Sequence, residues 1–219
     1  QRNLAYQAAH ILRNRFHCKD GVTIRIKKQI PVAAGLGGGS SDAAAVLRAL
    51  NSIWRLGLSL SELAKIALTI DSDVPYCIYN KLAHVTGHGE KIELLPPQPH
   101  YWAVIAKQKI SVSTPQILRQ INYEKLHHLN NEALLASLKK EDWQEATKYM
   151  GNVLEPLTMK FYPEIGRLKN KMKELGADVA QMSGTGPTVF AICHTESRAK
   201  RIQNSIRGFC RDVHVVTLL

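Results

Sequence analysis

Glycine is concentrated at one point of this 219-residue chain, since four of its 14 glycines lie within the five positions Gly35–Gly39. The alternating apolar segment Val22–Lys28 before them predicts a β-strand, and the run Ala43–Trp54 after them predicts a helix. Glycine allows positive φ and a close approach of backbone to ligand, while a helix start offers unpaired N–H groups and a positive dipole end. A strand, a glycine-rich loop and a helix in this order therefore predict an anion site suited to phosphate.

Two familiar phosphate loops do not match this stretch. A P-loop needs a lysine after its last glycine, and the dinucleotide fingerprint needs a glycine where this chain has Ser40. Ser40 and Ser41 add hydroxyl groups that can donate to a phosphate or bind its magnesium ion. The plainer alternative is a flexible turn before a helix of small residues.

The stretch Pro96–Pro99 is the strongest linker pattern in the chain and predicts two domains, 1–98 and 99–219. The helices expected in the first domain are 2–16, 43–54 and 59–69, and the strands are 22–28, 76–79, 82–86 and 91–95. The elements expected in the second domain are strands at 101–106, 178–182, 188–193 and 212–218, and helices at 114–121, 131–139, 142–152, 163–175 and 196–207. This order predicts an α+β fold in which helices back an antiparallel sheet.

The composition excludes several classes of protein. Hydrophobic residues make up 45% and charged residues 21%, as in folded globular chains, and no apolar run approaches the roughly 18 residues that a membrane helix needs. The net charge of +11 favours an anionic partner, but aromatic residues are not interleaved with Lys and Arg, so neither nucleic acid nor membrane is expected as a partner. Four scattered cysteines indicate a reducing, cytoplasmic compartment, and nine histidines lack metal-site spacing, so no metal ligand is expected.

The stretch Pro31–Ala44 resembles the phosphate loop of the galactokinase, homoserine kinase, mevalonate kinase and phosphomevalonate kinase (GHMP) superfamily. Further motifs resemble the same superfamily and occur in its order: Asn3-Leu4, Asp73-Val-Pro75, Gly87-His-Gly89-Glu90, Ser113-Thr-Pro115, Asn152-x-Leu154-Glu155-Pro156, Pro163-Glu-Ile165 and Met182-Ser-Gly-Thr-Gly-Pro187. The form of the loop is most similar to the branch that phosphorylates 4-diphosphocytidyl-2-C-methyl-D-erythritol at its 2-position hydroxyl, in non-mevalonate isoprenoid biosynthesis.

This resemblance carries expectations about fold and chemistry. It implies a two-domain GHMP kinase fold, with an N-terminal α/β domain like the second domain of ribosomal protein S5 and a C-terminal ferredoxin-like α+β sandwich. It implies an ATP-dependent kinase that uses Mg²⁺ bound with ATP, acts on a small-molecule alcohol, and is a monomer or weak homodimer.

The resemblance also implies the residues of the site. It makes Asp73 the catalytic base, although from the residues alone either Asp73 or the nearby Asp71 could be a plain turn former. The residues implied to bind the ATP phosphates are Pro31, Gly35, Leu36, Gly37, Gly38, Gly39, Ser40 and Ser41. The other implied contacts are Asn3, Leu4 and Lys28 for adenosine, Thr114 and Leu118 for the substrate, and a supporting turn of Ser183, Gly184, Thr185 and Gly186. Plainer roles remain open, because Lys28 also suits a solvated strand edge, Thr114 a helix cap and residues 183–186 a hairpin turn.

The chain departs from the superfamily pattern at two points. The Lys-Ile-Asn and Gly-Tyr-His-Glu segments expected before Asn3 are absent from it, so a further N-terminal segment is expected to precede this polypeptide. Leu118 stands where the branch often has an aromatic residue that stacks on cytosine. Two alternatives therefore remain: a sister kinase acting on homoserine or a mevalonate derivative, and a non-catalytic nucleotide-binding relative.

Overall fold

The computed structural model describes residues 3–210 and 212–218 and divides into two compact units. The first unit runs to Ile30 and resumes at Gly37–Leu95, while the second combines Pro31–Leu36 with the residues from Pro96 onward. The first half of the glycine-rich stretch therefore packs with the second unit and its second half with the first. The domain boundary after residue 98 remains a prediction.

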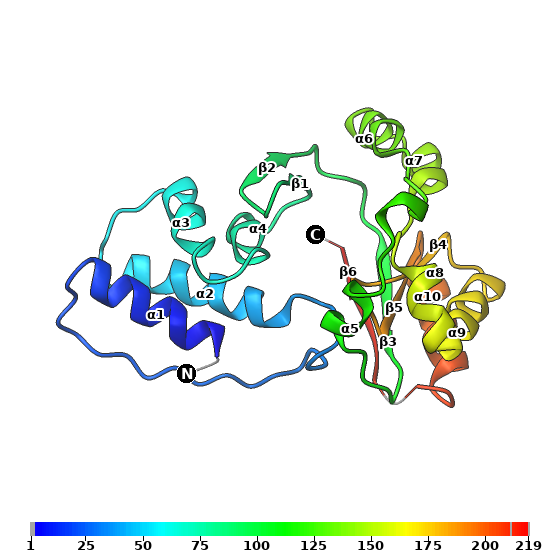
Figure 1. The fold of residues 1–219 in the computed structure, drawn as a ribbon, viewed down its shortest axis with the longest axis horizontal. Helices are drawn as coiled ribbons and strands as arrows, with labels where there is room; N and C mark the ends of the chain where they lie inside the picture. The colour runs from blue at the N-terminus through cyan, green and yellow to red at the C-terminus, as the bar shows by residue number, and fades with distance from the viewer. Residues whose placement is uncertain (1–2, 211, 219) are drawn as a thin grey trace. The chain divides into compact units, whose positions relative to one another are not determined.

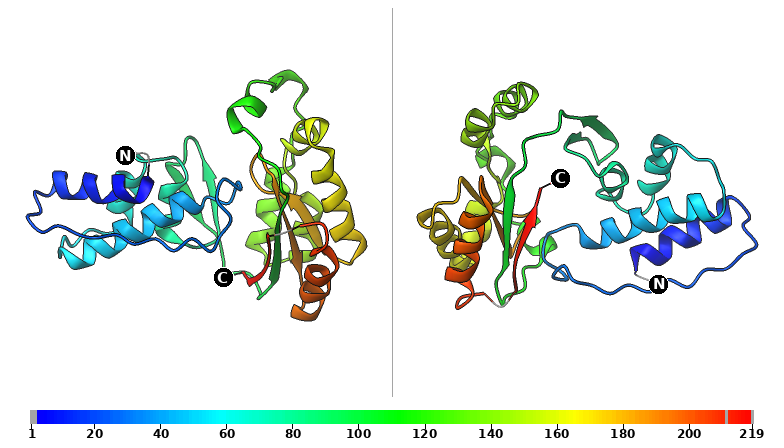
Figure 2. Two further views of the ribbon diagram at one scale, coloured as in Figure 1. Left: turned by 90° about the horizontal axis from the view of Figure 1, so that it is seen from below. Right: turned by 180° about the vertical axis from the view of Figure 1, so that it is seen from behind.

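The first unit is a helical layer with one small hairpin. Its elements are α1 (Leu4–Arg15), α2 (Gly38–Ile53), α3 (Leu60–Ala67), α4 (Val74–Tyr79), β1 (Ala83–Thr86) and β2 (Lys91–Leu94). Helices α1 and α2 lie side by side in every view (Figures 1 and 2), and the fully buried Leu12 and Leu47 contribute to their common core. Ser59 and Glu62 form the predicted capping box of α3, in which each side chain bonds to the other residue's backbone N–H.

Two local predictions in this unit are wrong. Val22–Lys28 is extended but belongs to no described sheet, because a strand needs a neighbouring backbone to share its hydrogen bonds and no described strand lies beside it. The segment predicted as a strand at 76–79 is part of α4, since Pro75 sits in the first turn of a helix and a short apolar run alone does not distinguish the two states.

The second unit is the predicted sandwich of helices on an antiparallel sheet. Its strands are β3 (Trp102–Lys107), β4 (Val179–Met182), β5 (Thr188–Cys193) and β6 (Asp212–Thr217), and its main helices are α6 (Asn131–Lys139), α7 (Trp143–Tyr149), α9 (Pro163–Glu174) and α10 (Glu196–Ile206). The strand order is β4-β5-β3-β6 with every pair antiparallel, which is the ferredoxin-like arrangement. Helices α9 and α10 cover one face of this sheet (Figure 1), and Ile165 and Ile202 are fully buried in the core between them.

Three short elements lie in the connections between the main helices and strands of this unit. They are α5 (Thr114–Leu118), a 3₁₀ turn (Tyr123–Lys125) and α8 (Glu155–Phe161), of which the sequence predicted only α5. Residues 183–187 join β4 to the adjacent antiparallel β5, as expected for a hairpin turn. None of the helices among the described residues combines the length and apolar character needed to cross a membrane.

Candidate active site

The N-terminus of α2 is an uncapped helix start. Gly37 has a left-handed φ of 60°, and the helix begins at Gly38, earlier than the predicted Ala43. Within the described residues no side chain caps this end, and its first turn carries no acidic residue. The free N–H groups of Gly37–Ser40 and the positive end of the helix dipole therefore meet in the second half of the predicted phosphate loop, where the Ser41 N–H already donates to the Gly37 carbonyl at 2.9 Å.

Two residues predicted to contact adenosine lie at this helix start. The Lys28 ammonium group is 2.6 Å from the Asp42 carboxylate and donates to the Gly38 carbonyl at 3.1 Å. The Leu4 side chain lies so close to Gly39 that a Cβ there would be 3.4 Å from Leu4 Cδ1. A positive charge and an apolar wall thus flank the uncapped N–H groups.

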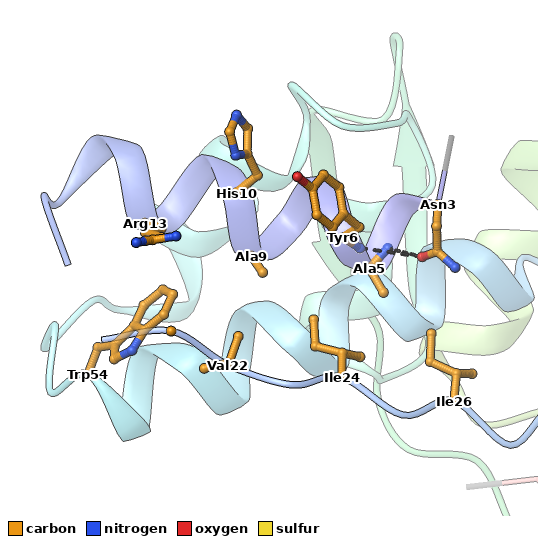
Figure 3. Close-up of a pocket in the computed structure, with 11 residues that line it drawn as sticks. Asn3, Ala5, Tyr6, Ala9, His10, Arg13, Val22, Ile24, Ile26 and Trp54 are labelled. Atoms are coloured by element: carbon orange, nitrogen blue, oxygen red, sulfur yellow. Dashed lines mark hydrogen bonds between the residues drawn. The ribbon is translucent and has the colours of Figure 1, made fainter. Parts of the chain in front are cut away.

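Asn3, the third predicted adenosine contact, caps α1. Its Oδ1 accepts hydrogen bonds from the backbone N–H groups of Ala5 at 2.9 Å and Tyr6 at 3.4 Å. Asn3 also lines one end of a pocket of about 340 Å³ between α1 and the extended segment Gly21–Ile26 (Figure 3). The opposite end of the pocket is lined by Trp54.

Asp73 immediately precedes α4 and is joined to the start of α2 through Asp71. One oxygen of the Asp71 carboxylate accepts a hydrogen bond from the Asp73 backbone N–H at 3.1 Å and a longer one from the Ser40 hydroxyl at 3.5 Å. Ser40 is buried, so this link connects the interior of the α2 N-terminus to the loop that carries Asp73. Partial loss of solvation and then the negative charge of Asp71 raise the pKa of the Asp73 carboxyl above its ordinary value.

Sequence reasoning missed the part played by Asp71. An aspartate that accepts from the N–H group two residues later forms a turn, so the Asp-Ser-Asp pattern could have indicated the bond to Asp73. The contact with Ser40 joins residues 31 positions apart, and no local pattern reveals it.

The Gly87–Glu90 turn between β1 and β2 supports the same loop. Gly89 has φ +100°, and a Cβ at this position would lie 2.1 Å from the Ser72 carbonyl oxygen. The Glu90 carboxylate accepts a hydrogen bond from the His88 N–H at 2.6 Å, which closes the turn. Because residue 89 is glycine, this turn can pack directly on the backbone of Ser72, which lies between Asp71 and Asp73.

In the second unit, the first half of the glycine-rich stretch is bound to the turn between β4 and β5. The Ser183 hydroxyl donates to the Gly35 carbonyl at 2.6 Å, and a Cβ on Gly35 would lie 2.6 Å from the Ser183 carbonyl oxygen. Lys107 in β3 donates to the Val32 carbonyl at 2.9 Å. Two bonds and one close backbone contact therefore fix Pro31–Leu36 within this unit.

The two residues predicted to contact substrate both lie in α5. The Thr114 hydroxyl is 2.7 Å from the Thr185 hydroxyl in the β4–β5 turn, and neither Ser113 nor Thr114 caps α5 through its side chain. Leu118 ends α5 with 46% of its surface exposed. Among residues 3–210 and 212–218, no group of three or more His, Cys, Asp and Glu side chains could hold a metal ion.

Comparison with known proteins places this arrangement in a family. Residues 3–81 match the family "GHMP kinases N terminal domain", and residues 134–212 match "GHMP kinases C terminal". The 4-diphosphocytidyl-2-C-methyl-D-erythritol kinase of Limosilactobacillus reuteri (strain DSM 20016) is 98% identical over 219 residues, which are all of this chain and 77% of that protein. Its counterpart in Limosilactobacillus fermentum is 70% identical over the same coverage.

A solved structure agrees with these relatives. A crystal structure of 4-(cytidine 5'-diphospho)-2C-methyl-D-erythritol kinase superposes with a TM-score of 0.84 and 31% identity, covering 98% of this chain and 77% of that one. Matches to both halves, high identity along the entire chain and a shared fold lead to one conclusion: the chain belongs to the 4-diphosphocytidyl-2-C-methyl-D-erythritol kinase family of the GHMP kinases.

Proposed function

We propose that this protein transfers the terminal phosphoryl group of ATP to the 2-position hydroxyl of 4-diphosphocytidyl-2-C-methyl-D-erythritol, a step of non-mevalonate isoprenoid biosynthesis. The observation that carries the proposal is the Ser40–Asp71–Asp73 link. It joins a carboxylate of raised pKa to an uncapped helix start that suits phosphate, which is what transfer to an alcohol requires.

Each group has a defined part in the proposed reaction. The free N–H groups of Gly37–Ser40 and the Ser41 hydroxyl bind the phosphates, while Pro31, Gly35 and Leu36 lead the loop toward them. Lys28, predicted to contact adenosine, donates to the Gly38 carbonyl at the same helix start, so its charge is proposed to neutralise the phosphates as well. Asp73 accepts the proton of the attacking hydroxyl and orients its oxygen. Because the transition state of phosphoryl transfer is loose, positioning and charge neutralisation supply most of the catalysis.

Magnesium is proposed to reach this helix start only as part of the ATP complex. When bound with ATP it supplies further neutralisation of the phosphate charge. The ion is proposed to have no dedicated set of protein ligands, although the hydroxyl groups of Ser40 and Ser41 at this helix start can meet it.

The proposal also covers the remaining predicted ligand contacts, the cellular compartment and the oligomeric state. Asn3 and Leu4 remain proposed contacts of adenosine, and Thr114 and Leu118 remain proposed contacts of the substrate. A reducing cytoplasmic compartment is proposed from the small number and the scattering of the cysteines, Cys18, Cys77, Cys193 and Cys210. A monomer or weak homodimer is proposed as the working state.

The acceptor is tested by offering three alcohols to the complete gene product with ATP and Mg²⁺. ADP release with the diphosphocytidyl compound should greatly exceed that with homoserine or mevalonate. Turnover of either small alcohol in its place would keep the kinase chemistry and contradict the proposed substrate.

Leu118→Phe tests whether α5 contacts the cytosine. Leu118 is 46% exposed, so a larger side chain can be accommodated without disturbing the core. An aromatic ring that stacks on the base should lower KM for the diphosphocytidyl substrate several-fold, since such a contact is worth about 0.5–1.5 kcal/mol. Leu60→Phe, at a similarly exposed leucine at the start of α3, is the control and should leave KM unchanged. An unchanged KM in Leu118→Phe would remove α5 from the cytosine site.

Asp71→Asn tests the charge next to the proposed base. Asparagine keeps an oxygen that can accept from Asp73 and Ser40, but it removes the negative charge that raises the pKa of Asp73. Without this charge Asp73 ionises more easily, so its pKa falls. Because the base must be ionised, the acid limb of the kcat/KM profile should move to lower pH. A limb that stays in place or moves to higher pH would contradict the coupling between these two carboxylates.

A further inference from the structure

Asn152 and Glu155 bind the backbone where β4 passes into the Ser183–Gly186 turn. The Asn152 side-chain amide donates to the carbonyl oxygens of Met182 at 2.9 Å and Gly184 at 2.7 Å. One oxygen of Glu155 accepts from the Met182 N–H at 2.6 Å. Three hydrogen bonds from two side chains thus fix both the donor and the acceptor groups at the start of this turn.

The Glu155 side chain is buried and held in one position by its bonding partners. The residue is only 6% exposed, and burial of a carboxylate is unfavourable unless its oxygens are bonded. Its second oxygen forms an ion pair with Lys169 in α9, so both oxygens have partners. Thr158, one turn further along α8, adds a long bond of 3.5 Å to the Thr185 carbonyl. The turn is consequently held by α8 through side chains and not only by its own strands.

The Ser183–Gly186 turn itself contacts the first half of the glycine-rich stretch. The Ser183 hydroxyl donates to the Gly35 carbonyl at 2.6 Å, and the backbones of Gly35 and Ser183 lie in close contact. Gly35 is two residues from Gly37, where the chain enters the helix start proposed to bind phosphate. A shift of Ser183 would therefore move the backbone that leads into this helix.

We propose that Asn152 and Glu155 are positioning residues for nucleotide binding, which act through the Ser183–Gly186 turn on Gly35. This inference rests on the proposed function, because it assumes that the loop after Gly35 binds ATP. The Asn152–Pro156 motif would then do more than begin α8: it would also position the turn that contacts Gly35. A purely structural role would instead lower the melting temperature and leave nucleotide affinity unchanged.

The test measures the Kd of a non-hydrolysable ATP analogue by calorimetry, together with Tm, KM and kcat, in the complete gene product. Asn152→Ala should raise Kd and the KM for ATP by about 3- to 10-fold, because it removes both side-chain bonds to the turn, with a smaller change in kcat. Ser183→Ala should act in the same direction. The double variant should show less than the combined effect, since both changes interrupt one chain of contacts.

Gln203→Ala is the matched control. Gln203 in α10 also donates from its amide to a backbone carbonyl, that of Val213 at 3.1 Å, which lies in β6 and not in the turn. This variant should bind nucleotide as the wild type does, whatever its Tm.

The outcomes separate the inference from the proposed function. Wild-type affinity in Asn152→Ala and Ser183→Ala would overturn the inference alone, even if their Tm falls. If Asn152→Ala does not fold, the partly exposed Ser183 still decides the question through Ser183→Ala. A wild-type protein that binds no ATP analogue would overturn the proposed function and this inference with it.

Discussion

Asp73→Asn should lower kcat by roughly 10²- to 10⁴-fold, the contribution expected of a positioned general base. Asparagine preserves the shape of the side chain but cannot accept the proton of the attacking hydroxyl. The Kd for ATP should change little, because the proposed phosphate contacts are backbone N–H groups of α2 and Lys28. Steady-state kinetics and calorimetry on the complete gene product separate these two quantities.

A matched control distinguishes loss of the base from a local change in structure. Asp142 also directly precedes a helix, α7, where its carboxylate accepts from the Glu145 N–H at 3.0 Å. Asparagine caps a helix about as well as aspartate, so Asp142→Asn should keep full activity and stability. Near-normal turnover in Asp73→Asn would show that another group accepts the proton.

Gly35→Ala should weaken ATP binding by roughly tenfold to a hundredfold. Gly35 has φ +71°, where an L-residue is strained by about 1–2 kcal/mol. The added Cβ would also lie 2.6 Å from the Ser183 carbonyl oxygen and 3.2 Å from that of Gly186. Both obstacles are backbone atoms of one turn, so the loop itself must move away. Calorimetric titration with an ATP analogue measures the loss.

Gly57→Ala is the control that separates the effect of backbone strain at a positive φ from the effect of the contact with the Ser183–Gly186 turn. Gly57 has a similar φ of +68°, but a Cβ there meets nothing within 4 Å. Gly57→Ala should therefore lower Tm slightly and leave the Kd for ATP unchanged. Equal losses of affinity in both variants would mean that the contact between Gly35 and the turn is not needed for binding.

Much of the second unit could be predicted from local sequence. The bounds of α6 and β5 match their predicted ranges, because amphipathic helices and short apolar strands are separated there by clear turn residues. The first unit was harder. The Val22–Lys28 pattern places Val22, Ile24 and Ile26 on one side, and these three side chains do line the pocket beside α1. Pairing into a sheet, however, depends on a neighbouring strand that local sequence does not specify. The start of α2 at Gly38 was also missed, because glycines argue against a helix unless its N-terminus serves another purpose.

The candidate site shows the same division between local and long-range information. The glycine-rich loop could be interpreted directly from its residues, whereas the choice of Asp73 over Asp71 came from the family resemblance. The structure adds contacts between distant residues: Ser40 with Asp71, and Gly35 with Ser183 across 148 positions. These contacts depend on tertiary packing, so neither periodicity nor motif spacing contains them.

The most direct test of the central claim is to follow the labelled terminal phosphoryl group of ATP with the complete gene product, Mg²⁺ and 4-diphosphocytidyl-2-C-methyl-D-erythritol. The label should pass to the 2-position hydroxyl with one ADP formed for each product, and Asp73→Asn should slow this transfer while it still binds ATP. Release of the label only as inorganic phosphate, with no labelled acceptor formed, would contradict the proposed kinase activity.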